Sequence, residues 1–186
     1  MKPGLIMEEI FPEIKLIQQK HYQEHIVYIW EELWQESEWE DIFDLPISPK
    51  VEYSHVIHNR AVVQNALQIS NTFEEFHNSK INRDILLTAG LLQDVSKLVE
   101  FRPTDNGKVE YTTIGLTYPH AFWGAQLAIK HGVPHEICEI ILDHTPDSAR
   151  FPKSIEGKIL YYADQLDMIA IVGDRFTKES YIRIFK

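Results

Sequence analysis

Helical periodicity is the feature that most constrains this chain. In residues 12–37 the apolar side chains recur three or four positions apart, and similar spacing returns repeatedly after residue 55. Apolar residues at this spacing line one face of an α-helix, whereas a half-buried strand needs them at every second position. Amphipathic helices bury their apolar faces by packing against one another. The sequence therefore predicts an all-α fold.

Turn and capping residues divide this pattern into segments. Residues 38–53 and 145–153 contain prolines and read as loops, and 102–119 is a long connection with a turn signal at Asp105-Asn106-Gly107 and a short extended piece at 109–111. Gly132 and Gly173 are expected to end helices. The expected helices are 12–37, 55–70, one that Asn82 caps and that runs through Val95, 120–130, one that Pro134 opens, and 155–171.

The domain organisation follows from length and from this division. A chain of 186 residues suits one domain with an extension. We expect residues 1–50 to form an N-terminal helical extension that packs on the core. Residues 51–186 would form the main domain, a bundle of about five core helices. An exposed aromatic face on the extension could support a homodimer.

Charge and cysteine content exclude several classes of protein. The chain carries 18 Lys and Arg against 28 Asp and Glu, a formal net charge of −10. Because phosphate backbones are neutralised by Lys and Arg, we do not expect duplex nucleic acid as a partner. Cys138 is the single cysteine, so an internal disulfide and a thiolate zinc cluster are excluded. We find neither a membrane-spanning apolar run nor a signal-peptide layout at the beginning, and we expect a cytoplasmic protein without membrane association.

Nine histidines are many for this length, and several lie beside the apolar stripes of the expected helices. A buried imidazole needs partners for its ring nitrogens, and a buried carboxylate without a cation is costly. A divalent cation held between helices satisfies both requirements. Nitrogen and oxygen ligands suit one or two ions of Mn, Fe, Ni, Co, Zn or Mg. The candidate ligands on the inward faces are His58, Asp94, His120, His144 and Asp164.

The order of these residues resembles the HD-domain superfamily of metal-dependent phosphohydrolases. Its pattern is a His on one helix, a His-Asp pair on the next, often two further His, and a late Asp. The resemblance runs from about residue 55 to 170 and implies an HD-domain-like helical bundle. The matching segments are His58 with Val62 and Ala66, Ala89–Lys97 around Asp94, Pro119–Ala125 around His120, Ile141–Thr145 around His144, and Ala163–Asp167 around Asp164.

The resemblance also implies two cation positions that share Asp94. In the first, His58 and Asp164 would join Asp94. In the second, His120 and His144 would join it.

The chain departs from the family pattern at one ligand. Gln93 stands where the family has the His of the His-Asp pair. An amide oxygen suits harder cations better than zinc, so Gln93 would be a weak ligand. Separately, His55 lies one turn before His58 and could be the ligand instead of His58, although the register of the apolar residues favours His58.

The function that the resemblance implies is a metal-dependent phosphohydrolase, in which activated water attacks a nucleotide or another small phosphorylated metabolite. Asp94 would hold the cation or cations, and Lys97 would offset charge on the phosphoryl group. The 102–119 connection would shape the substrate pocket. One alternative is an HD-type non-heme iron oxygenase, with a di-iron site, acting on a small polar substrate. Another, motivated by Gln93, is a degenerate HD domain that binds without turnover.

Overall fold

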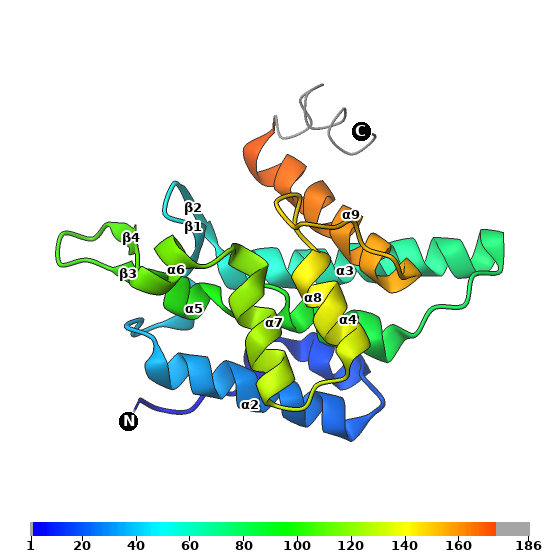
Figure 1. Ribbon diagram of the computed structural model, residues 1–186, viewed down its shortest axis with the longest axis horizontal. Coiled ribbons are helices and arrows are strands. Elements are labelled where there is room, and N and C mark those ends of the chain that lie inside the picture. Colours follow the sequence, from blue (N-terminus) through cyan, green and yellow to red (C-terminus); the bar gives the residue numbers. More distant parts are fainter. Residues whose placement is uncertain (1, 174–186) are drawn as a thin grey trace.

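The computed structural model describes residues 2–173, and most of them lie in helices, as predicted (Figure 1). The two small sheets are antiparallel hairpins, β1–β2 and β3–β4. The helices are α1 (Met7–Ile10), η1 (Pro12–Leu16), α2 (Lys20–Glu36), η2 (Ile42–Asp44), α3 (His55–His77), α4 (Arg83–Leu92), α5 (Lys97–Glu100), α6 (Thr113–Thr117), α7 (His120–Lys130), α8 (His135–Asp143) and α9 (Ile155–Val172). The strands are β1 (Pro46–Ser48), β2 (Val51–Ser54), β3 (Phe101–Pro103) and β4 (Val109–Tyr111).

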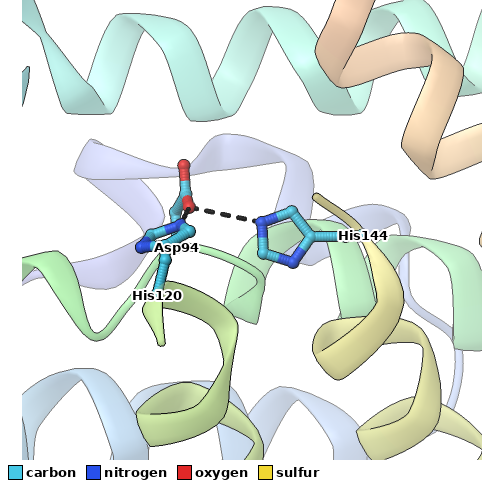
Figure 2. Close-up of side chains that lie close together, drawn as sticks. All are labelled: Asp94, His120 and His144. Carbon is cyan, nitrogen blue, oxygen red and sulfur yellow. Dashed lines mark hydrogen bonds and ion pairs between the residues drawn. The ribbon is translucent and has the colours of Figure 1, made fainter. Parts of the chain in front are cut away.

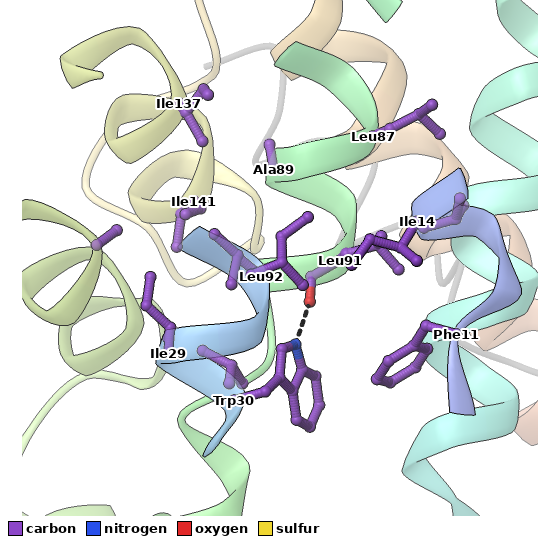
Figure 3. Close-up of a cluster of buried hydrophobic side chains, with 14 of the residues drawn as sticks. Phe11, Ile14, Ile29, Trp30, Leu87, Ala89, Leu91, Leu92, Ile137 and Ile141 are labelled. Atoms are coloured by element: carbon purple, nitrogen blue, oxygen red, sulfur yellow. Dashed lines mark hydrogen bonds between the residues drawn. The ribbon is translucent and has the colours of Figure 1, made fainter. Parts of the chain in front are cut away.

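Helix α4 occupies the centre of the fold. Its residues from Asp84 to Leu92 are all buried, and it packs against α2, α3, α8 and α9. The Asn82 side chain accepts the N–H of Ile85 and caps the helix, as the sequence predicted. Figure 3 shows the apolar side chains around this helix, where the indole of Trp30 donates a 2.9 Å hydrogen bond to the carbonyl of Leu91. The residues that directly follow α4, Gln93–Ser96, are therefore also buried.

The predicted helix over 12–37 is two helices, η1 and α2. The carboxylate of Asp84 accepts the backbone N–H groups of Gln18 and Gln19, each at 2.9 Å, immediately before α2. A helix start leaves such N–H groups without intrahelical partners, and here a side chain from α4 supplies the acceptor. A residue distant in sequence therefore stabilises a break that the apolar spacing did not reveal.

Two segments expected to be loops contain local structure. Residues 38–53 hold η2, β1 and the beginning of β2, and 102–119 holds most of the β3–β4 hairpin together with α6. The extended piece at 109–111 is confirmed as β4, and Gly107 has a φ of 74° in the turn. Helix α3 continues beyond the predicted end to His77, where Asn78 has a φ of 52°. Strands of three or four residues are too short to give a distinct pattern.

The N-terminal helices share the core of the remaining chain. Phe11, Ile26 and Trp30 are fully buried and belong to the same apolar cluster as Leu91. Trp30, Trp34 and Trp39 are thus buried in the chain's own core and give the predicted homodimer no support. The domain division at residue 50 stays a prediction, and residues 174–186 of the predicted main domain lie outside the described residues. Within 2–173 no helix combines the length and apolarity that crossing a membrane requires.

Candidate metal centre

Asp94 lies just beyond the C-terminal end of α4, and one of its carboxylate oxygens faces two histidines (Figure 2). Oδ1 is 2.5 Å from Nε2 of His120, at the start of α7, and 3.4 Å from Nε2 of His144, which follows α8. The ligand atoms of these three residues all lie within 4.8 Å of one another. Among residues 2–173, no other group of three or more His, Cys, Asp or Glu residues has its ligand atoms this close together. Such a set could hold a metal ion.

The other carboxylate oxygen of Asp94 faces α3. Oδ2 is 3.5 Å from Nε2 of His58, which in turn lies 3.2 Å from Oδ1 of Asp164 on α9. The ammonium of Lys97 is 2.7 Å from the same Oδ2. The structure thus brings His58, His120, His144 and Lys97 to the carboxylate of Asp94, and it places Asp164 against His58.

The three histidines are held through their second ring nitrogens. Each Nδ1 lies within hydrogen-bond distance of an oxygen, and each Nε2 faces Asp94. The Nδ1 partners are Oδ2 of Asp167 for His58 at 2.7 Å, Oε2 of Glu100 for His120 at 3.0 Å, and the carbonyl of Ile141 for His144 at 2.6 Å. An acceptor at Nδ1 fixes the tautomer that leaves Nε2 free for a cation, and metal-ligating histidines are usually held this way.

Sequence reasoning did not identify Glu100 and Asp167 as imidazole partners. Both are buried, with 5% and 8% of their surface exposed. Each is a carboxylate inside an apolar stretch, Leu98-Val99-Glu100-Phe101 and Leu166-Asp167-Met168. Since a buried carboxylate needs a partner, that placement was the available signal.

The charges of the Asp94 carboxylate and of its neighbours shift one another's pKa values. The pKa of Asp94 lies well below its ordinary value: burial alone would raise it, but the positive charges of Lys97 and His120 outweigh burial. Burial would also lower the pKa of His58, yet hydrogen bonds to Asp164, Asp167 and Asp94 raise it to about 10. For His120 the charge of Asp94 and the hydrogen bonds to Asp94 and Glu100 outweigh burial and raise the pKa to about 9. In the absence of metal, protons on these imidazoles balance the carboxylates, and a divalent ion would replace them.

His55 lies close to this site, and Gln93 directly precedes Asp94 in the chain, but neither side chain is hydrogen-bonded. Both side chains are fully buried, and neither the ring nitrogens of His55 nor the amide atoms of Gln93 have a hydrogen-bond partner. Nε2 of His55 is 4.0 Å from Oδ2 of Asp94. Burial, only partly offset by the charge of Asp94, lowers the pKa of His55 to about 3, so this ring is neutral. The buried polar atoms of both side chains are therefore unsatisfied.

A cavity of about 320 Å³ opens onto the carboxylate and histidine cluster. Tyr111, Gly115 and Tyr118 contribute to its wall, so part of the 102–119 segment borders the site. Ile47 and Val51 from the β1–β2 hairpin segment add apolar surface. The site residues in its lining are His58, Asp94, Lys97, His120, His144 and Asp164. The cavity therefore joins potential cation ligands to space for a small organic molecule.

Comparison with known proteins agrees with this architecture. The model of the HD domain family matches residues 56–169, so this chain belongs to the HD domain family. It is also similar to the dihydroneopterin 2',3'-cyclic phosphate phosphodiesterase of Methanocaldococcus jannaschii, with 28% identity over 111 residues. The matched region is 59% of this chain and 44% of that protein, so the chain spans less than half the length of this relative. No solved structure matches the chain significantly.

Proposed function

We propose that this chain is a metal-dependent phosphohydrolase that acts on a nucleotide or another small phosphorylated metabolite. The observation that carries the proposal is the position of Asp94. Its two oxygens face different histidines, His120 and His144 on one side and His58 on the other, at the wall of a cavity that also contains Lys97. The phosphodiesterase to which the chain is similar supports the same reaction class.

The donor set fits divalent metal. His120 and His144 would bind an ion together with Oδ1 of Asp94, and His58 and Asp164 would bind one on the Oδ2 side. Imidazole nitrogens and carboxylate oxygens suit Mn, Fe, Co, Ni and Zn, and the carboxylates also suit Mg. When bound, such an ion polarises a phosphoryl oxygen and activates water.

Lys97 would bind the phosphate. Hydrolysis joins the oxygen of water to phosphorus and breaks the bond from phosphorus to the leaving oxygen, so negative charge on the phosphoryl oxygens must be offset. The Lys97 ammonium lines the cavity and contacts Oδ2 of Asp94 at 2.7 Å. Once a cation takes that oxygen, the ammonium can turn to a phosphoryl oxygen. Lys97 therefore serves the substrate and not the metal.

The cavity indicates a small substrate. Its volume of about 320 Å³ is near the lower end of the range of roughly 300–1,000 Å³ for small-molecule sites. Tyr111 and Tyr118 in its wall offer aromatic surface to the organic part of an ester. Because the similar protein of Methanocaldococcus jannaschii is a cyclic phosphate phosphodiesterase, a cyclic phosphodiester is the first compound to test.

The experiment is hydrolysis by metal-depleted protein reloaded with one divalent ion at a time. The panel contains 2',3'-cyclic nucleotides, phosphomonoesters and bis(p-nitrophenyl) phosphate. We expect turnover with at least one ion, loss of turnover in Asp94→Asn, and unchanged turnover in Asp105→Asn, which alters an exposed carboxylate of the β3–β4 turn. No turnover of any compound with any ion would overturn the proposal.

The oxygenase and the binding-only domain stay predictions, as does the cytoplasmic location. Anaerobic loading with Fe(II), followed by oxygen, tests the oxygenase through oxygen consumption in the presence of small polyols. A chain that binds cyclic nucleotides tightly without turnover would favour the binding-only domain. Each of these outcomes differs from metal-dependent hydrolysis.

A further inference from the structure

His55 is a buried side chain that the hydrogen bonds of the described structure leave unsatisfied. Its ring is 0% exposed, and neither nitrogen has a partner. An unsatisfied buried polar group costs free energy, and native structures seldom keep one without a reason. Because His55 begins α3 inside the apolar core, packing alone would favour an apolar residue there. Both ring nitrogens of His55 are therefore available to bind a ligand.

The ring is directed toward the candidate metal centre. One neighbour is the indole of Trp30, with ring centroids 5.7 Å apart, and another is Oδ2 of Asp94, 4.0 Å from Nε2. His58 lies one helical turn later on the same face of α3, with its Nε2 3.5 Å from the same oxygen. Two imidazole nitrogens therefore approach Oδ2 from one helix.

Gln93, the residue before Asp94, supplies no imidazole to the site. Its amide is buried and unpaired, and an amide is a poorer ligand than imidazole for most transition metals. Without His55, the Oδ2 side would have one imidazole, from His58, together with the carboxylates of Asp94 and Asp164. With His55 it would have two imidazoles and two carboxylates.

We infer that His55 is a ligand of the cation on the Oδ2 side of Asp94, where its Nε2 supplies the imidazole that Gln93 lacks. Nε2 must move closer to Oδ2 as the ion displaces the Lys97 ammonium from that oxygen. The inference rests on the proposed function only in assuming that the site binds divalent metal. It assigns the two cation positions different ligands: His55, His58 and Asp164 on one side, and His120 and His144 on the other.

The test is a titration of metal-depleted protein with Co(II), followed by calorimetry and by the visible absorption of the bound ion. His55→Phe keeps an aromatic ring against Trp30 and removes both nitrogens. His77→Phe makes the same change at an exposed position of the same helix and is the control. We expect two ions in the wild type and the control. In His55→Phe, we expect the affinity of one ion to fall by at least about tenfold and its absorption band to change. Unchanged affinities and spectra in a folded His55→Phe variant would overturn the inference.

A rescue variant tests the relation to Gln93. In His55→Phe combined with Gln93→His, the new imidazole should restore the affinity of the weakened ion. A folded double variant whose metal binding equals that of His55→Phe alone would overturn the inference that His55 replaces the imidazole absent at residue 93.

A measurement on the wild type covers the case in which His55→Phe does not fold. In protein labelled with ¹⁵N-histidine, zinc should shift the Nε2 resonance of His55 together with that of His58. A His55 resonance that stays in place while His58 shifts would overturn the inference. These readouts do not depend on turnover, so a chain that binds metal through His55 but hydrolyses no ester contradicts only the proposed function.

Discussion

Nδ1 of His58 lies 2.7 Å from Oδ2 of Asp167, one turn along α9 from Asp164, whose own carboxylate lies 3.2 Å from Nε2 of the same ring. Successive turns of one helix thus contact both nitrogens of one imidazole. Asp164 lies on the side where a cation would bind, and Asp167 holds the ring from behind.

Asp167→Ala should weaken metal binding without removing a ligand. Loss of the Nδ1 partner releases the orientation of His58, and such partners are typically worth 10–100-fold in affinity. Competition with a chelating indicator measures the effect. Lys158→Ala, at an exposed position of α9, should bind as the wild type does. An unchanged affinity in Asp167→Ala would show that packing alone orients His58.

Lys97→Met should separate substrate binding from metal binding. If the ammonium serves the phosphoryl group, turnover should fall by roughly 10²–10³-fold, as for other single donors to a developing charge. Metal affinity should stay equal or rise, because Lys97 no longer competes for Oδ2 of Asp94. Steady-state kinetics and metal titration check the two effects. A parallel loss of both would assign Lys97 to the metal site.

The stability of the metal-free protein should decrease as pH rises. The pKa values of His58 and His120, about 10 and about 9, lie above the ordinary value of 6.5. Their contribution is therefore complete below about pH 6.5 and is lost as the pH passes through about 9 and 10. At low pH two further groups contribute. The contribution of Asp94, whose pKa lies well below its ordinary value, is lost only in strong acid, whereas His55, with its pKa lowered from 6.5 to about 3, reduces stability as the pH falls below about 6.5.

Metal should reverse this slope, because cations and protons compete for the same nitrogens and the stabilisation by metal grows with pH. Urea unfolding between about pH 6 and pH 10, with a chelator or with saturating metal, gives both curves. Parallel curves would contradict the proton exchange.

Asp84→Ala should destabilise the fold by about 1–2 kcal/mol, the usual cost of losing a helix cap. Its carboxylate accepts the N–H groups of Gln18 and Gln19 and so joins the start of α2 to α4. Chemical denaturation measures the loss. Asp105→Ala, in the exposed turn of the β3–β4 hairpin, should leave the midpoint unchanged. Equal midpoints for the two variants would mean that water replaces the Asp84 contact.

Local patterns predicted several of the long helices, and the order of the motifs predicted residues that meet. Apolar spacing over 155–171 and the Asn82 cap predicted α9 and the start of α4 closely, because helix formation depends on neighbours three or four positions away. The motif order placed His58, Asp94 and His144 on the same site. In the structure, Nε2 of His58 lies 3.5 Å from one oxygen of the Asp94 carboxylate, and Nε2 of His144 lies 3.4 Å from the other.

Contacts between distant segments determined the rest. Asp84, on α4, accepts a backbone N–H group at the point where the predicted 12–37 helix is interrupted. Asp167 and Glu100 contact the rings of His58 and His120, which lie on other helices. His55 and His58 lie one turn apart on α3, and the register of the apolar residues favoured His58. Only the tertiary structure shows that His58 is hydrogen-bonded and His55 is unsatisfied. Spacing along a chain specifies which face of a helix a residue occupies. The atom that its side chain meets depends on how separate helices pack, and no local pattern encodes that distance.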